Sequence, residues 1–146
     1  MARTLRTLGT AAAVTACLLV TAASFGQEAS QPPPVEIPAA ATTLEGLPSV
    51  RIDSSEAGAI RRVLGATEAA QDRLTISVVD GEYFWTSRGN RPLRLSKSGE
   101  FTYLSSTPGQ YVRLTRFNDR ITYVEHVDQK SGSVTWWGEL RFIVNQ

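Results

Sequence analysis

One acidic and basic pair stands out among the residues that could perform chemistry. The only histidine of this 146-residue chain is His126, and Glu125 directly precedes it in the stretch ITYVEH. A carboxylate and an imidazole are common partners in general acid–base catalysis near neutral pH. One hypothesis is therefore a small hydrolase or lyase that uses Glu125 and His126 together with an arginine.

The apolar pattern around this pair argues against a shared site. Ile121, Tyr123 and Glu125 alternate with polar residues, which predicts a strand whose neighbouring side chains point to opposite faces. Glu125 would then point inward beside Tyr123, whereas His126 would point the other way. Because a buried carboxylate needs a partner, we expect a structural ion pair between Glu125 and Arg113 on the preceding predicted strand.

A second candidate site lies in the connection FWTSRGNRPL, residues 84–93. Trp85 leads there into Arg88 and Arg91, and two guanidinium groups beside an indole could bind the carboxylate or phosphate of a ligand. The alternative is a structural turn, because Gly89-Asn90 supplies unusual backbone angles. Both interpretations stay open at the level of the sequence.

The aromatic residues of the predicted strands are expected to fill the core of a small domain without disulfides. Trp136 and Trp137 are neighbours and must point to opposite faces, and the face of Trp137 is otherwise polar. Trp137 is therefore the candidate for an exposed aromatic side chain that binds a glycan or a protein. Alternatively, the predicted helix or the N-terminal tether covers it.

Composition excludes several classes of function. Residues 27–146 contain no cysteine and one histidine, which excludes thiol chemistry, iron–sulfur clusters and zinc sites built on cysteine or on several histidines. We expect neither a cofactor nor a metal. The same residues carry 13 Lys and Arg against 14 Asp and Glu, so there is no basis for binding nucleic acid.

The N-terminus predicts export. Arg3 and Arg6 precede an uncharged stretch from Leu8 to Phe25, which is typical of a signal peptide over residues 1–26. The alternatives are an uncleaved signal that anchors the protein in the membrane and lipidation at Cys17, because VTAC resembles a bacterial lipobox. Contact with a membrane is expected only through one of these, and the protein is otherwise periplasmic or secreted.

The region after the signal predicts a tether and one helix. Residues 27–50 are rich in proline and read as a tether. Asp53 and Glu56 fit a capping box, and the apolar stripe that follows predicts a short amphipathic helix near 54–64, ending at Gly65. Residues 66–72 could add another turn.

From Asp72 onward the pattern changes to strict alternation with short turns, among them Asp80-Gly81. About seven strands follow one another, which predicts a mainly β domain over residues 51–146. We expect a single antiparallel meander, either a curled sheet or a small barrel, with the helix at its N-terminal side. No motif indicates a known family.

The function favoured by these features is an exported, β-rich binding or interaction module of the cell envelope or exterior. Its ligand would be a small molecule, a glycan or a protein, bound through Trp85, Arg88, Arg91 or Trp137. The alternatives are the small hydrolase or lyase and a purely structural envelope protein. A filled interior would favour binding by the surface, whereas a cavity lined by arginine and aromatic residues would favour a small ligand.

Overall fold

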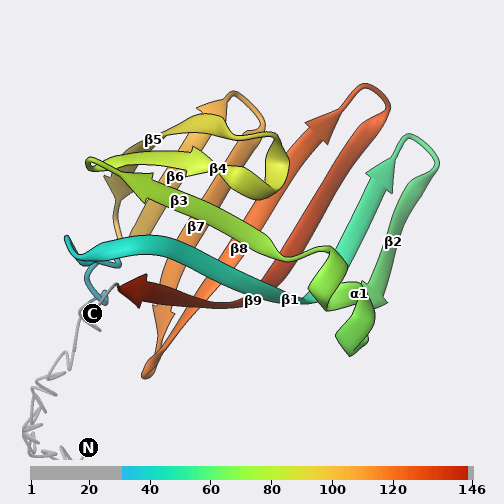
Figure 1. Ribbon diagram of the computed structural model, residues 1–146. Helices are drawn as coiled ribbons and strands as arrows, with labels where there is room; N and C mark the ends of the chain where they lie inside the picture. Colours follow the sequence, from blue (N-terminus) through green and yellow to red (C-terminus); the bar gives the residue numbers. More distant parts are fainter. Residues whose placement is uncertain (1–30, 145–146) are drawn as a thin grey trace, which may run out of the picture.

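Strands dominate the computed structural model, which describes residues 31–144 (Figure 1). In chain order the elements are β1 (Ala41–Ser55), β2 (Gly58–Val63), α1 (Ala66–Gln71), β3 (Leu74–Val79), β4 (Glu82–Trp85), the 3₁₀ turn η1 (Thr86–Arg88), β5 (Arg91–Ser98), β6 (Phe101–Thr107), β7 (Gln110–Phe117), β8 (Arg120–Gln129) and β9 (Gly132–Val144). The predicted signal peptide and Cys17 lie outside the described residues. Within them, no helix is long and apolar enough to span a membrane.

Eight of the strands close into a barrel. Consecutive strands from β3 to β9 pair in antiparallel fashion, and β1 joins the two ends by pairing with both β3 and β9. The extra strand β2 pairs with the second half of β1 and stands beside the barrel, above α1 in Figure 1. Closure satisfies strand edges that an open sheet would expose. The prediction of a mainly β, antiparallel small barrel is confirmed, with nine strands in place of about seven.

The closing strand β1 depends on one glycine and one irregularity. A Cβ atom on Gly46 would lie 2.5 Å from the ring of Tyr123, so only glycine lets that ring pack against β1. The register with β9 shifts between Pro48 and Val50, where β1 turns away from β3 toward β2. The predicted tether over residues 27–50 is therefore partly strand, since residues 41–50 belong to β1.

The predicted helix over residues 54–64 is wrong. These residues form the hairpin of β1 and β2, and Gly58 has a backbone φ of 126°, which interrupts any helix. Asp53 does not cap a helix but binds Arg51 and Arg62. The helix α1 begins later, where Gly65 precedes it and donates its amide hydrogen to Glu68 Oε2 at 3.0 Å. Pairing with β1 outweighs the local helical pattern.

The seven strands predicted after Asp72 are all present. Their turns have the expected chemistry: Asp80 and Gly81 adopt φ values of 52° and 81°, as a two-residue hairpin turn requires. Because the turns fix the register, they also fix which residues of each strand point inward. The two strands that sequence reasoning missed, β1 and β2, precede this region.

Side chains fill the interior of the barrel. Val35, from the segment before β1, is fully buried at one end, where the Thr102 hydroxyl donates to its carbonyl oxygen at 2.7 Å. An eight-stranded barrel is just wide enough for its own side chains. The buried hydrophobic cluster comprises Val35, Leu44, Leu74, Ile76, Trp85, Leu93, Leu104, Val112, Leu114, Tyr123 and Leu140.

Candidate functional site

A charged cluster is buried inside the barrel around Glu125. The Glu125 side chain is 0% exposed; Trp85 Nε1 donates to its Oε1 at 3.0 Å, and an Arg88 guanidinium nitrogen donates to its Oε2 at 3.1 Å. Arg88 Nε also lies 2.9 Å from Oε1, so the guanidinium approaches both oxygens. We call Trp85, Arg88 and Glu125 the inner cluster.

Burial dominates the electrostatics of this cluster. Loss of water raises the pKa of Glu125 from its ordinary value of 4.5 to about 7, and the opposing effects of Arg88 and Trp85 are smaller. Burial also raises the pKa of Tyr123, and the charge of nearby Glu125 acts in the same direction. The carboxyl group of Glu125, which is not exposed to solvent, therefore has a pKa near neutral pH.

The turn η1 places Arg88 over the end of the barrel. Ser87 fixes this turn to β3, because its Oγ accepts from the Thr75 amide at 3.0 Å. Gly89 and Asn90 follow with φ values of 80° and 55°, which reverse the chain into β5. The Gly89-Asn90 turn of the structural interpretation is present, and it directly follows Arg88, whose side chain reaches Glu125.

The expected ion pair between Glu125 and Arg113 is not what the structure has, because Glu125 pairs with Arg88. Arg113 alternates with Val112 and Leu114, which point into the barrel, so its own side chain lies on the outer face. There its guanidinium carbon stacks 4.6 Å from the ring centroid of Phe101. Adjacent strands therefore do not supply the partner; the turn at the barrel end does.

The inner cluster continues toward β2 through a chain of alternating charges. Arg88 stacks 4.6 Å from the ring centroid of Trp136, whose Nε1 donates to Asp72 Oδ2 at 2.8 Å. Arg51 binds the same Asp72 oxygen at 3.1 Å and Asp53 Oδ1 at 2.7 Å. The neighbouring arginine holds the pKa of Asp53 below its usual range. This chain joins the barrel to the β1–β2 hairpin.

His126 lies outside this cluster, on the opposite face of β8. Its Nδ1 lies 2.8 Å from Thr135 Oγ1, its Nε2 lies 3.1 Å from Asp128, and its ring stacks on Tyr111 with 5.3 Å between centroids. The prediction that Glu125 and His126 point to opposite faces is confirmed. The two groups cannot act on one substrate, since the barrel wall separates them.

Aromatic side chains gather on the outer face of β6–β9. Their rings meet in a row: Phe101 and Tyr103 lie 6.1 Å apart, Tyr103 and Tyr111 lie 6.1 Å apart, and Tyr111 continues to His126. Trp137 is in register with Val124, which places it at the β9 side of this face. We call this surface the outer aromatic face; it comprises Phe101, Tyr103, Tyr111, Arg113, Phe117, Val124, His126 and Trp137.

Two grooves border the outer aromatic face. The Trp137 groove has a volume of about 530 Å³ and is lined by Ser49, Phe101, Arg113, Thr115, Phe117, Thr122, Tyr123, Val124, Trp137, Gly138 and Glu139. The Tyr103 groove has a volume of about 450 Å³ and is lined by Arg94, Ser96, Tyr103, Ser105, Ser106, Thr107, Pro108, Gly109 and Tyr111. A further pocket of about 470 Å³ beside α1 shares Ser49 and Glu139 with the Trp137 groove.

The four residues predicted to bind a ligand therefore do not form one site. Trp85 and Arg88 are engaged inside the barrel by Glu125, and Arg91 is exposed and donates to Gln110 on β7. Trp137 is half-buried and lines a groove. Sequence reasoning missed most of the outer aromatic face because it assigned these rings to the core. Residues 31–144 contain no cluster of three acidic, cysteine or histidine side chains that could hold a metal ion.

No known protein family matches this chain, and neither the curated proteins nor the solved structures contain a significant match.

Proposed function

We propose that this protein is an exported, non-enzymatic binding module whose ligand docks on the outer aromatic face. The observation that carries the proposal is the position of Trp137. It lies on the outer side of a closed barrel, in a groove that also exposes Phe117 and Arg113. Tryptophan, other aromatic residues and arginine are the side chains that contribute most to binding where they can be desolvated by a partner.

The filled interior supports binding by the surface. Trp85, Tyr123 and Glu125 occupy the barrel together with the aliphatic core, and each is 1% exposed or less. Trp85 and Arg88, which could have lined an internal ligand site, instead donate to the carboxylate of Glu125. A ligand would meet the remaining aromatic residues, which lie on the outside and keep partly exposed rings.

The geometry gives the hydrolase or lyase hypothesis less support. A general acid or base must reach the proton that it transfers, directly or through one water. Glu125 is sealed inside the barrel, and His126 is engaged by Thr135 and Asp128 on the outside. The binding module requires no shared site for these two groups.

Export is supported by the arrangement of charged and apolar residues at the N-terminus, with Arg3 and Arg6 before the uncharged stretch 8–25. The mass of the intact protein isolated from cells tests this part of the proposal. A chain that begins near Gln27 is expected. A mass increased by lipid at Cys17, and sensitive to globomycin, would instead indicate a lipid anchor.

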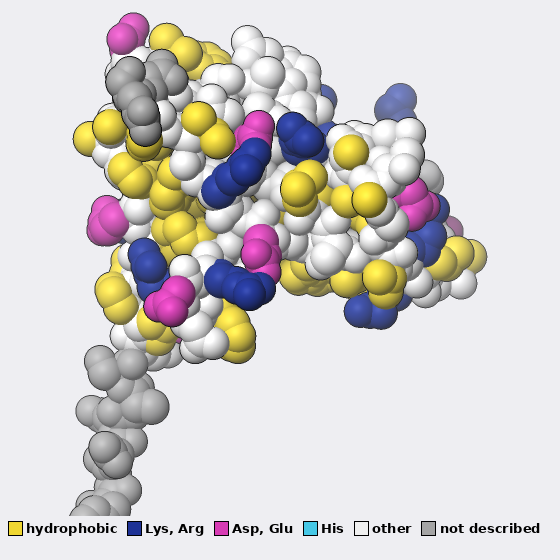
Figure 2. Space-filling model, turned by 60° about the horizontal axis from the view of Figure 1, so that its bottom comes forward, with side chains coloured by type: hydrophobic (Ala, Val, Ile, Leu, Met, Phe, Trp, Pro, Cys, Tyr) yellow, Lys and Arg dark blue, Asp and Glu magenta, His cyan; other side chains and the backbone are white. Residues whose placement is uncertain are grey.

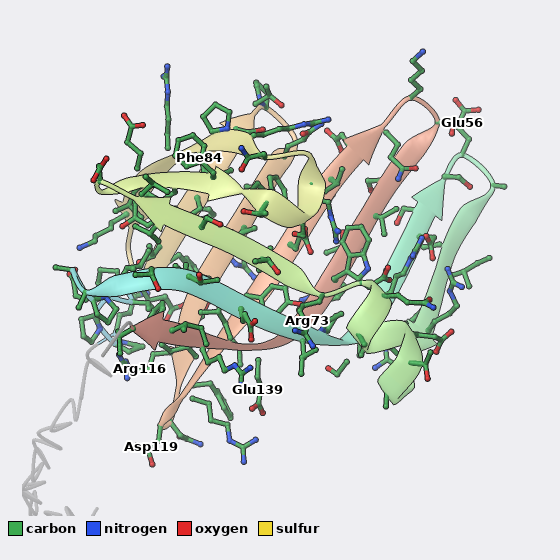
Figure 3. All side chains as sticks on the ribbon, in the orientation of Figure 1. Glu56, Arg73, Phe84, Arg116, Asp119 and Glu139 are labelled. Atoms are coloured by element: carbon green, nitrogen blue, oxygen red, sulfur yellow. The ribbon has the colours of Figure 1, made fainter. Side chains whose placement is uncertain are left out.

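Binding is tested with the protein expressed with its own leader. Isolated cell envelopes and an array of glycans are incubated with wild type, Trp137→Ala and Phe84→Ala. Phe84 is a control for the Trp137 groove because it is also a half-buried outward aromatic residue, but it lies on β4 and lines a different groove (Figure 3). We expect Trp137→Ala to weaken binding about tenfold or more, since a central tryptophan typically contributes over 1 kcal/mol.

The outcome that contradicts the proposal is equal retention of the three proteins. Thermal unfolding of each variant separates a lost contact from a lost fold. Binding that depends on Phe84 but not on Trp137 would place the ligand at the groove between β4 and β5, and not in the Trp137 groove.

A further inference from the structure

Two arginines at the outer aromatic face lack carboxylate partners: Arg113, which belongs to it, and Arg94, which lies beside it on the outward side of β5. Elsewhere acidic and basic side chains are interspersed, as on the side with β1 and β9 that Figure 2 brings forward, where Arg141 binds Glu45 at 2.5 Å. Within residues 31–144, no ion pair or side-chain hydrogen bond engages Arg94 or Arg113, although Arg113 stacks on the ring of Phe101. Arg61 and Arg116 likewise have no such partner among these residues. The positive charges of Arg94 and Arg113 are therefore available to a ligand.

The two grooves hold these charges in different settings. No acidic residue lines the Tyr103 groove, which contains Arg94. The Trp137 groove contains Arg113 and one acid, Glu139, whose carboxylate binds Arg120 at 2.6 Å. An anionic group in either groove would thus meet a guanidinium that no carboxylate within the described residues neutralises, and such pairs are strong when partly desolvated.

Hydroxyl groups dominate the rest of the Tyr103 groove. Ser96, Tyr103, Ser105, Ser106, Thr107 and Tyr111 contribute six of its nine lining residues. Hydroxyl groups that line one groove beside the Arg94 guanidinium favour a ligand that carries many hydroxyl and carboxylate oxygens.

The rings provide flat surfaces between these polar groups. Tyr103 lies between Arg94 and Arg113 in strand order, since β6 carries Tyr103 between β5 and β7. From β5 to β9 the two grooves span four strand spacings, roughly 19 Å along the wall at about 4.8 Å per strand, and this is half of the circumference of the eight-stranded barrel. A ligand that uses both grooves must therefore be long enough to curve around the wall and must present flat faces to tyrosine and tryptophan at intervals.

We infer that the ligand of the outer aromatic face is a linear polysaccharide that carries carboxylate groups, such as a polymer of uronic acids. This inference rests on the binding function proposed above and names its ligand class. Sugar rings stack on Tyr103, Tyr111 and Trp137, carboxylates bind Arg94 and Arg113, and hydroxyl groups bond to the serines of the Tyr103 groove. Two unpaired arginines are too few for a polyphosphate, which needs an extended basic surface.

The test compares polygalacturonate with the same polymer after reduction of its carboxyl groups, by isothermal titration calorimetry. We expect wild type to bind the acidic polymer and to lose about tenfold or more affinity for the reduced polymer, because charge-assisted bonds are lost. Arg94→Gln should reproduce part of this loss on the acidic polymer, because Arg113 keeps its carboxylate contact. Arg61→Gln is the control, because this substitution removes the same charge. Arg61 is exposed on β2 and lies outside the outer aromatic face.

Three results would overturn the inference. Equal affinity for the two polymers would show stacking without recognition of charge. Equal losses in Arg94→Gln and Arg61→Gln would show an unspecific effect of net charge. Absence of binding to either polymer, combined with envelope binding that depends on Trp137 and is removed by protease treatment of the envelopes, would make the ligand a protein and leave the proposed function standing.

Discussion

Arginine and aromatic side chains meet twice in this molecule, once inside the barrel and once on its outer wall. Inside, Arg88 is held by Glu125 and by the ring of Trp136, and Trp85 donates to the same carboxylate. Outside, Arg113 rests on Phe101 without a carboxylate among residues 31–144. The same residue types thus form a closed set in one place and an open set in the other.

This difference separates structural from functional use of similar residues. A buried charge must be compensated by groups inside the protein. The side chains of the inner cluster therefore bind one carboxylate and not a ligand. An exposed arginine can remain unpaired at little cost because water solvates it. Unsatisfied groups on the outer aromatic face are therefore compatible with a stable fold, and they are the groups that a partner can use.

Removal of Arg88 should have the largest effect on stability. Arg88→Met leaves Glu125 buried without its cation, which typically costs about 3–5 kcal/mol in the free energy of unfolding. Urea unfolding at pH 8, where the wild-type carboxyl is ionised, measures this loss. Arg91→Met is the matched control on the same connection and should change stability by no more than about 0.5 kcal/mol.

A double substitution sharpens this result. Glu125→Leu combined with Arg88→Met removes both charges, and we expect it to recover most of the stability lost in Arg88→Met. If Arg88→Met lowered the free energy of unfolding by less than about 1 kcal/mol, the Arg88–Glu125 pair would contribute no more than a solvent-exposed ion pair. The contrast between the inner cluster and the outer aromatic face would then fail.

The pH dependence of stability should reveal the carboxyl group of Glu125. The unfolded chain releases this proton near the ordinary pKa of 4.5, whereas the folded chain keeps it until about pH 7. Between these values the folded state binds more protons, so its stability falls as the pH rises, by about 3 kcal/mol in all. The contribution is fully present below about pH 4.5 and is lost above the folded pKa of about 7.

Glu125→Gln isolates this effect, because the difference between wild type and variant cancels the other titrating groups. Urea midpoints of both proteins between pH 4 and 8 provide the measurement. A difference that stays constant over this range would show that the folded carboxyl has the same pKa as in the unfolded chain, and a wild-type stability that rises with pH near 4.5 would show that Arg88 outweighs burial.

The inner cluster and the outer aromatic face also differ in how far the sequence predicts them. Alternation and turn residues are local signals, so the strands after Asp72 and the inward direction of Glu125 could be predicted. The partner of Glu125 could not, because Arg88 reaches it through the three-dimensional path of η1 and not through strand register. β1 was missed for a similar reason: most of its pairing is with β9, about 90 residues further along the chain.

The outer aromatic face had a signal that composition obscured. Phe101 and Tyr103 alternate with Thr102 and Leu104, so both rings share one face of the predicted strand. The expectation that aromatic residues fill the core made Leu104 and Tyr103 equally good candidates for the interior. Only barrel closure, which puts Leu104 inside at 0% exposure, decides between the two faces.

The smallest effect on stability is expected at the rim of the outer aromatic face. Phe117 is 67% exposed, so Phe117→Ala removes little buried area and should change the free energy of unfolding by no more than about 0.5 kcal/mol. Leu114, on the same strand, points into the core, and Leu114→Ala should cost about 2–5 kcal/mol. Chemical denaturation of both variants measures the contrast between the two faces of β7.

The same pair of variants then separates stability from binding. Phe117 lines the Trp137 groove, so Phe117→Ala should weaken retention on cell envelopes although its fold is as stable as wild type. Leu114→Ala, assayed below its unfolding temperature, should retain binding despite its lower stability. If binding instead followed stability across both variants, the outer wall would contribute through the fold alone, and the open set of arginine and aromatic residues would have no separate role.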